Sequence, residues 1–98
     1  MQLLKNPRFI IYNLFNQHLL EYYRKDIRES MAELSAAIES NQMAQKPELE
    51  DRVNALLDTC QRHGFGASEI SLYRRDLESI KKSDATIMQQ YRPYLKQH

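Results

Sequence analysis

The sequence has few residues that break or cross-link a chain. Its 98 residues include two glycines, three prolines, one cysteine and no tryptophan. This scarcity of helix breakers favours helices over a turn-rich β-fold. The lone cysteine, Cys60, excludes an internal disulfide and is typical of a reducing compartment, so we expect a cytoplasmic protein.

Strong charge of one sign and long apolar runs are also missing. The formal net charge is +1, which gives no general attraction to nucleic acid or to a membrane surface. Polar residues interrupt the most apolar stretch well before the roughly 20 apolar residues that a membrane span needs. The first residues do not resemble a signal peptide. We therefore expect neither a membrane segment nor a secreted domain.

What remains is a helical pattern along the whole chain. Apolar residues recur at helical spacing over about 7–40, 47–63 and 68–92. The hydrophobic content of 42% is enough for one modest core, so we expect a single domain over 1–98. The predicted fold class is all-α, a three-helix bundle whose first helix is long, in a chain that forms a dimer.

Proline and glycine predict where these helices begin and end. Pro7 and Pro47 suit the first position of a helix, where a missing N–H is harmless. Gly64 suits the left-handed position that follows a helix, with Phe65 folding back as its hydrophobic contact. The segment Ser83-Asp84 either interrupts the third helix or, with Ser83 as the cap, begins a fourth, so a four-helix bundle stays open.

The stretch from Pro7 to Tyr23 is apolar on more than one face of a helix. Placed at 100° per residue, its apolar side chains form two stripes. A helix covered on one side needs only one such stripe, so we expect a second copy of the chain to cover this one. The predicted interface residues here are Phe9, Ile11, Tyr12, Phe15, Leu19, Tyr22 and Tyr23.

The second half of the first predicted helix carries a narrower apolar stripe. Its residues follow one another at gaps of 7, 4, 3 and 4, which is the spacing of a coiled-coil seam. We expect this seam to contact either the second copy or a different protein. It consists of Leu20, Ile27, Met31, Leu34 and Ile38.

The sequence holds no arrangement of residues that predicts catalysis, a cofactor or a metal. Cys60 and His63 share a helical face, but a structural zinc needs four ligands, and no other residues group with this pair. The order of one long and two shorter helices is similar to that of the small all-helical chorismate mutases. This resemblance implies several basic residues pointing into the bundle, whereas Arg8, Arg24 and Arg28 fall off the seam. We therefore expect no enzymatic activity.

The expected function is protein–protein interaction. A small cytoplasmic factor of adaptor, chaperone-like or regulatory type, binding a protein partner through apolar helix faces, fits the pattern best. The alternative is a helix-turn-helix DNA-binding regulator over residues 53–82. In that alternative the DNA contacts come from Ser68, Ser71, Arg74 and Arg75, although Glu69 would stand where phosphates crowd the helix.

Overall fold

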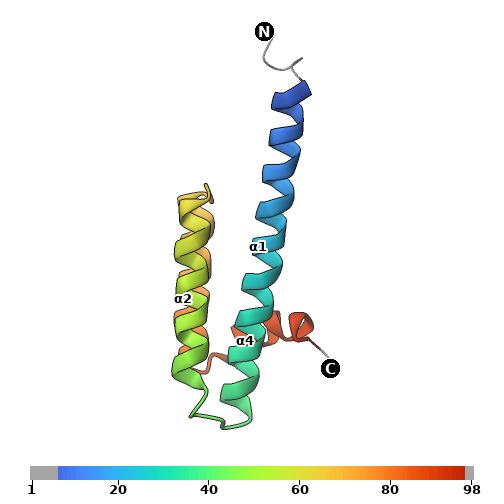
Figure 1. Ribbon diagram of the computed structural model, residues 1–98. Coiled ribbons are helices and arrows are strands. Elements are labelled where there is room, and N and C mark those ends of the chain that lie inside the picture. Colours follow the sequence, from blue (N-terminus) through green and yellow to red (C-terminus); the bar gives the residue numbers. More distant parts are fainter. Residues whose placement is uncertain (1–6, 97–98) are drawn as a thin grey trace.

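A computed structural model describes the backbone of residues 7–96 and the side chains of residues 17–96. The predicted all-α fold class is confirmed over this range, which contains helices and no strand. The elements are α1 (Pro7–Glu39), α2 (Lys46–Arg62), α3 (Ala67–Lys81), α4 (Ala85–Tyr91) and a final 3-10 turn, η2 (Arg92–Tyr94). Figure 1 shows α1 beside α2, with α4 crossing near the C-terminal end of α1.

The three main helices end in the same way, with one residue in the left-handed conformation directly after the cap. These residues are Asn41 (φ 63°), Gly64 (φ 96°) and Ser83 (φ 63°). At Gly64, its own N–H binds the carbonyl of Gln61, and the N–H of Phe65 binds that of Cys60 at 3.1 Å. This is the Schellman pattern. The predicted stop at Gly64 is therefore confirmed.

The third predicted helix is divided in two. α3 ends at Lys81, and α4 begins at Ala85. Asp84 caps α4 by accepting hydrogen bonds from the backbone N–H groups of Thr86 (3.0 Å) and Ile87 (3.4 Å). The N-cap of α4 is thus Asp84 and not Ser83, because Ser83 adopts the left-handed conformation that ends α3.

The core lies between the C-terminal half of α1 and the helices that follow. From Ile27 onward, buried side chains recur about every third or fourth residue along the helices, as the periodicity predicts. Since α1 contacts α2, α3, α4 and η2, it is the central element of the described part. The fully buried side chains are Ile27, Met31, Leu34, Val53, Leu57, Cys60 and Ile80.

The first turns of α1 extend past the rest of the bundle. At 1.5 Å per residue, the 33 residues of α1 span about 50 Å, while the 17 residues of α2 span about 26 Å. Figure 1 shows the blue, N-terminal part of α1 rising beyond the end of α2. The radius of gyration is 16.2 Å, against about 13 Å for a compact chain of this length. The fold therefore leaves one end of a helix standing clear of the other elements.

Candidate interaction surface

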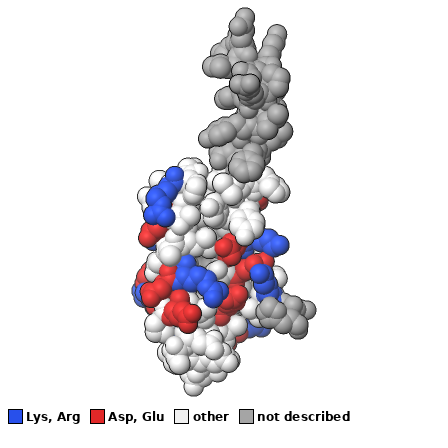
Figure 2. Space-filling view, viewed as in Figure 1, with Lys and Arg blue, Asp and Glu red and all other residues white. Residues whose placement is uncertain are grey.

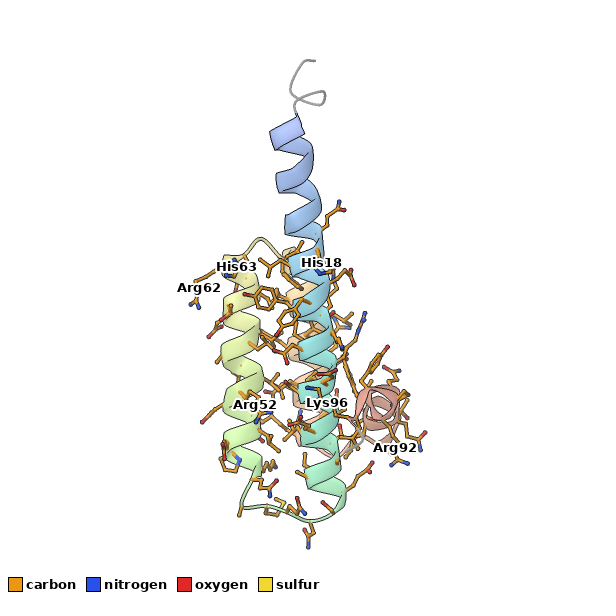
Figure 3. All side chains as sticks on the ribbon, turned by 45° about the vertical axis from the view of Figure 1, so that its right-hand side comes forward. His18, Arg52, Arg62, His63, Arg92 and Lys96 are labelled. Carbon is orange, nitrogen blue, oxygen red and sulfur yellow. The ribbon has the colours of Figure 1, made fainter. Side chains whose placement is uncertain are left out.

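The α2–α3 turn marks the level at which α1 leaves the bundle. His63 at the end of α2 and His18 on α1 lie at about the same height in Figure 3. The α1 backbone from residue 7 to about 17 therefore has no neighbouring helix from the described part of this chain. Four of the predicted interface residues, Phe9, Ile11, Tyr12 and Phe15, have side chains that lie outside the described residues.

An aromatic cluster closes this end of the bundle. The ring of Tyr23 stacks on His63 with centroids 5.5 Å apart, and it meets Phe65 edge-on at 6.5 Å. Phe65 reaches this position because the Schellman turn directs the chain back toward α1. Tyr23, predicted as an interface residue, is half-buried and packs mainly within its own chain.

Beside the cluster, an ionic network ties α1 to the start of α3. Arg24 donates from Nε to Oε2 of Glu69 at 2.7 Å and from Nη2 to Oε1 at 3.0 Å. Tyr73 donates from its hydroxyl to the same Oε2 at 2.9 Å. The guanidinium also lies 5.2 Å from the centroid of the Phe65 ring. A bidentate pair of this kind fixes orientation as well as distance, so the network sets the position of α3 relative to α1.

The network shifts the protonation of its members. The hydrogen bond from Arg24 lowers the pKa of Glu69, and the bond from Tyr73 lowers it further. Burial, followed by the bond to Glu69, raises the pKa of Tyr73 to about 12. At neutral pH the carboxylate is therefore charged and the phenol is protonated, which is the state in which every bond of the network forms. Spacing alone did not predict this network, because its members come from two distant segments.

Tyr22 is the most exposed of the predicted interface residues with a described side chain. It is 63% exposed and meets Tyr23 edge-on with ring centroids 6.1 Å apart. Leu19, one turn earlier, is half-buried. A shallow hollow of about 120 Å³ adjoins Tyr22 and is lined otherwise by charged residues: Lys25, Asp26, Glu29 and Lys96. Among the described side chains, the exposed ring of Tyr22 is thus bordered on this side by charges.

The predicted coiled-coil seam is used inside the chain. Ile27, Met31 and Leu34 have no exposed surface, and Ile38 packs against the same core. Their neighbours there include Val53, Leu57 and Ile80. This revises the expected use of the seam, because side chains enclosed by α2 and α3 have no surface left for a partner. Its heptad spacing satisfies a bundle within one chain as well as it would a coiled coil between two chains.

The residues of the DNA-binding alternative lie on the outer face of α3. Ser68, Ser71 and Arg75 are exposed, while Arg74 donates to Asp58 of α2 at 2.8 Å. Glu69 is held by Arg24 and does not face outward alone. In both ribbon views α3 runs along the direction of α2, whereas the helices of a helix-turn-helix cross at about 90–120°. The pair forms an αα-hairpin.

Cys60, His18 and His63 do not gather into a metal site within the described residues. Cys60 is fully buried, and burial raises the pKa of its thiol to about 11. His63 is exposed and stacks on Tyr23. Among the residues that the structure describes, no three His, Cys, Asp or Glu side chains are placed to hold one ion. In the same part of the chain, no helix combines the length and the apolar character that crossing a membrane requires.

Charges of both signs mix on the visible surface. Figure 2 shows a band of acidic and basic side chains across the middle of the described part, with uncharged surface at the end that carries the α1–α2 loop. Exposed ion pairs contribute to this mixing, for example Arg52 with Glu33 and Arg92 with Glu39. Such a face offers no broad basic patch to a phosphate backbone.

Comparisons with known proteins do not indicate a function for this surface. No protein-family model, no curated protein and no solved structure matches the chain.

Proposed function

We propose that this protein is a small, non-enzymatic interaction factor of the cytoplasm that forms a dimer through the first half of α1. The observation that carries the proposal is the length of α1. Its first turns extend beyond α2 and α3, and they carry Phe9, Tyr12 and Phe15 in a segment that is apolar on two faces. A helix of this kind needs a cover, and the rest of the described chain is too far along α1 to supply one.

A second copy is the simplest cover because it brings the same apolar segment. Each fully buried aromatic ring contributes about 1.5–3 kcal/mol relative to exposure. Even after the loss of translational and rotational freedom, several such rings on each copy can hold two chains together. The exposed ring of Tyr22 extends this surface toward the bundle, and we propose that a different protein is bound there or on the mixed-charge faces of α2 and α3.

The self-association is tested with Tyr12→Asp combined with Phe15→Asp. We expect the mass in solution, measured by light scattering over a concentration series, to fall to that of one chain. A matched control is Met43→Asp combined with Leu72→Asp. These two residues are also exposed and apolar (52% and 49%) but lie outside α1, so their replacement should leave the mass unchanged. A mass that is the same for both pairs would contradict the proposal.

The partner is sought by pull-down from native lysate with and without nuclease, washed at high salt. We expect one protein in a defined ratio under both conditions. The DNA-binding alternative makes the opposite prediction, since affinity carried by Arg74 and Arg75 should fall steeply with salt. Replacing both arginines by alanine should abolish that binding, and should leave a partner held by an apolar helix face in place.

A further inference from the structure

Residues 85–96 fold back over α1 as an arm. The arm is held by the buried side chains of Met88 and Tyr91, which belong to the core, and by several polar contacts. Two are exposed ion pairs to α1, from Arg92 to Glu39 at 2.8 Å and from Lys96 to Glu29 at 3.4 Å. Figure 3 shows Arg92 on this arm, to the side of the α1–α2 pair. Tyr91 also donates a hydrogen bond to Asp76 of α3, and the Tyr94 ring lies beneath the guanidinium of Arg28.

The fit between the arm and α1 is incomplete. Ser35 of α1 is 3% exposed, and its hydroxyl has no hydrogen-bond partner. It borders a gap of about 30 Å³ between α1 and the arm, lined also by Ala32, Met88 and Leu95. Buried polar groups normally have a hydrogen-bond partner. The unpaired hydroxyl therefore indicates that the arm does not pack fully against α1 at this point.

The heptad pattern of apolar residues in α3 continues into α4, across the break between the two helices. Gaps of three and four alternate without interruption from the start of α3 to the end of α4, as in one continuous amphipathic helix. Asp84 occupies the one polar position of the series. The series is Ile70, Tyr73, Leu77, Ile80, Asp84, Ile87 and Tyr91.

The break itself depends on two residues. Ser83 adopts a φ of 63°, a conformation that is unfavourable for a residue with a Cβ. Asp84 compensates by capping α4. A helix that continued through Lys82, Ser83 and Asp84 would remove the left-handed residue, at the loss of that cap. This three-residue break, the hinge, therefore sets the strain at Ser83 against the cap that Asp84 provides.

We propose that α3 and α4 join into one helix in a second state of this protein, in which the arm of each copy packs on α1 of another copy. The occupant of the vacated α1 surface is the arm of a second copy because that arm reproduces every contact of the closed form, from Arg92 on Glu39 to Tyr91 on Asp76. Both states contain the same contacts outside the hinge. Their relative free energy therefore depends on the conformation of the hinge. This exchange uses the end of α1 opposite to the segment of the proposed dimer, and it does not depend on that dimer.

The first test compares two substitutions of one exposed hinge residue. Ser83→Gly relieves the strain of the left-handed conformation and disfavours a continuous helix. Ser83→Ala keeps that strain and favours the continuous helix. In a chain that also carries Phe15→Asp, to remove association through the first half of α1, we expect Ser83→Ala to lower the dissociation constant of the dimer and Ser83→Gly to raise it. Each change should be roughly tenfold or more.

The second test reads the exchange directly. One preparation carries Glu39→Cys and another carries Arg92→Cys; the two are mixed, incubated at high concentration and treated with a short bismaleimide. A covalent product containing both chains, beyond the yield expected from chance encounters of two exposed thiols, is expected when the arm of one copy lies on α1 of the other. Cys60 is buried and its thiol pKa is raised to about 11, so the unsubstituted chain serves as an unreactive control.

The expected result is a mixed product that increases with Ser83→Ala and decreases with Ser83→Gly. The doubly substituted chain, Glu39→Cys with Arg92→Cys, should cross-link within one molecule in the closed state, which shows that the reagent spans the two sites. If that internal product forms while the mixed product is absent for all hinge variants, the exchange does not occur and the proposal is overturned.

Discussion

Among single residues, the buried pair of Asp76 and Tyr91 shows how much can be read from spacing. Asp76 lies on the same helical face as Tyr73, Leu77 and Ile80 and is 8% exposed, a position consistent with the helical period although its burial was not predicted from the sequence. The helical period does not predict the hydrogen-bond donor to Asp76, because Tyr91 reaches Asp76 only after the chain has turned at the hinge. Tyr91 donates its hydroxyl to Oδ2 of Asp76, and burial raises the pKa of this phenol above its usual range.

Tyr91→Phe should destabilise the fold because it leaves a buried carboxylate without that donor. We expect a loss of about 1–3 kcal/mol in the free energy of unfolding, measured by urea denaturation. Tyr94→Phe is the matched control, since Tyr94 is 42% exposed and should change stability by less than about 0.5 kcal/mol. Equal effects of the two substitutions would show that Asp76 does not depend on Tyr91.

Arg24→Gln should destabilise the protein in a pH-dependent way. Because Arg24 lowers the pKa of Glu69 in the folded state, the pair contributes stability above the ordinary carboxyl pKa of 4.5 and loses it as the pH falls below that value. At pH 7 we expect a loss of about 1 kcal/mol. The difference between variant and wild type should narrow toward pH 3.

Arg52→Gln provides the comparison for this experiment. Arg52 pairs with Glu33 on the surface, where the two side chains are 51% and 35% exposed. Solvent screens such a pair, so the substitution should change stability little at either pH. A similar pH-dependent loss for both variants would mean that the two-bond geometry of Arg24 has no special effect.

Among the elements, the helix ends were the most predictable feature and also the source of one error. Gly64 signalled its stop because glycine is the residue that most readily takes a left-handed φ. Asn41 and Ser83 take the same conformation, but nothing in the sequence distinguishes them from other polar residues. Of the two alternatives that the sequence leaves open, the one with a fourth helix places its cap at Ser83, one residue before its actual position at Asp84.

The two glycines of the α2–α3 turn should respond oppositely to the same substitution. Gly64 has a φ of +96°, whereas Gly66 is extended at the N-cap of α3 and has no side-chain cap; a Cβ meets no atom within 4 Å at either site. Gly64→Ser should therefore cost about 1 kcal/mol through backbone strain. Gly66→Ser should stabilise the protein by a few tenths of a kcal/mol, by adding a cap.

Thermal and urea unfolding of the two single variants would measure this difference. Since the side chain added is identical and both sites are open, the opposite signs would come from the left-handed backbone at Gly64 and from the N-cap position at Gly66. Two variants of equal stability would contradict the left-handed assignment of Gly64.

At the scale of the whole molecule, the sequence predicts which faces are apolar but not which chain covers them. Ile27, Met31 and Leu34 have the spacing of an intermolecular seam, and other helices of the same chain cover them. The apolar segment from Pro7 to Tyr23 was predicted by the same reasoning, and here the structure positions no helix of the described chain against its first turns. The difference depends on where α2 ends relative to α1, a tertiary distance that periodicity does not contain.

Removal of residues 1–16 should separate association from folding. The described core extends from Leu20 onward, so the shortened chain should keep a cooperative unfolding transition, with a loss below about 1 kcal/mol. Its mass in solution should fall to that of a monomer. Far-UV circular dichroism and light scattering would test both statements, and a shortened chain that fails to fold would assign the first turns of α1 to the core.

The arm also has a consequence for the order of folding. The contacts of α1 with α2, and of α2 with α3, join neighbours in sequence and can form quickly, whereas η2 must return to α1 across the length of the chain. Docking of the arm should therefore be the last kinetic step. During that interval the uncovered side of α1 is open to other molecules, so the protein concentration during refolding, or the density of ribosomes during synthesis, becomes a determinant of which chain an arm reaches.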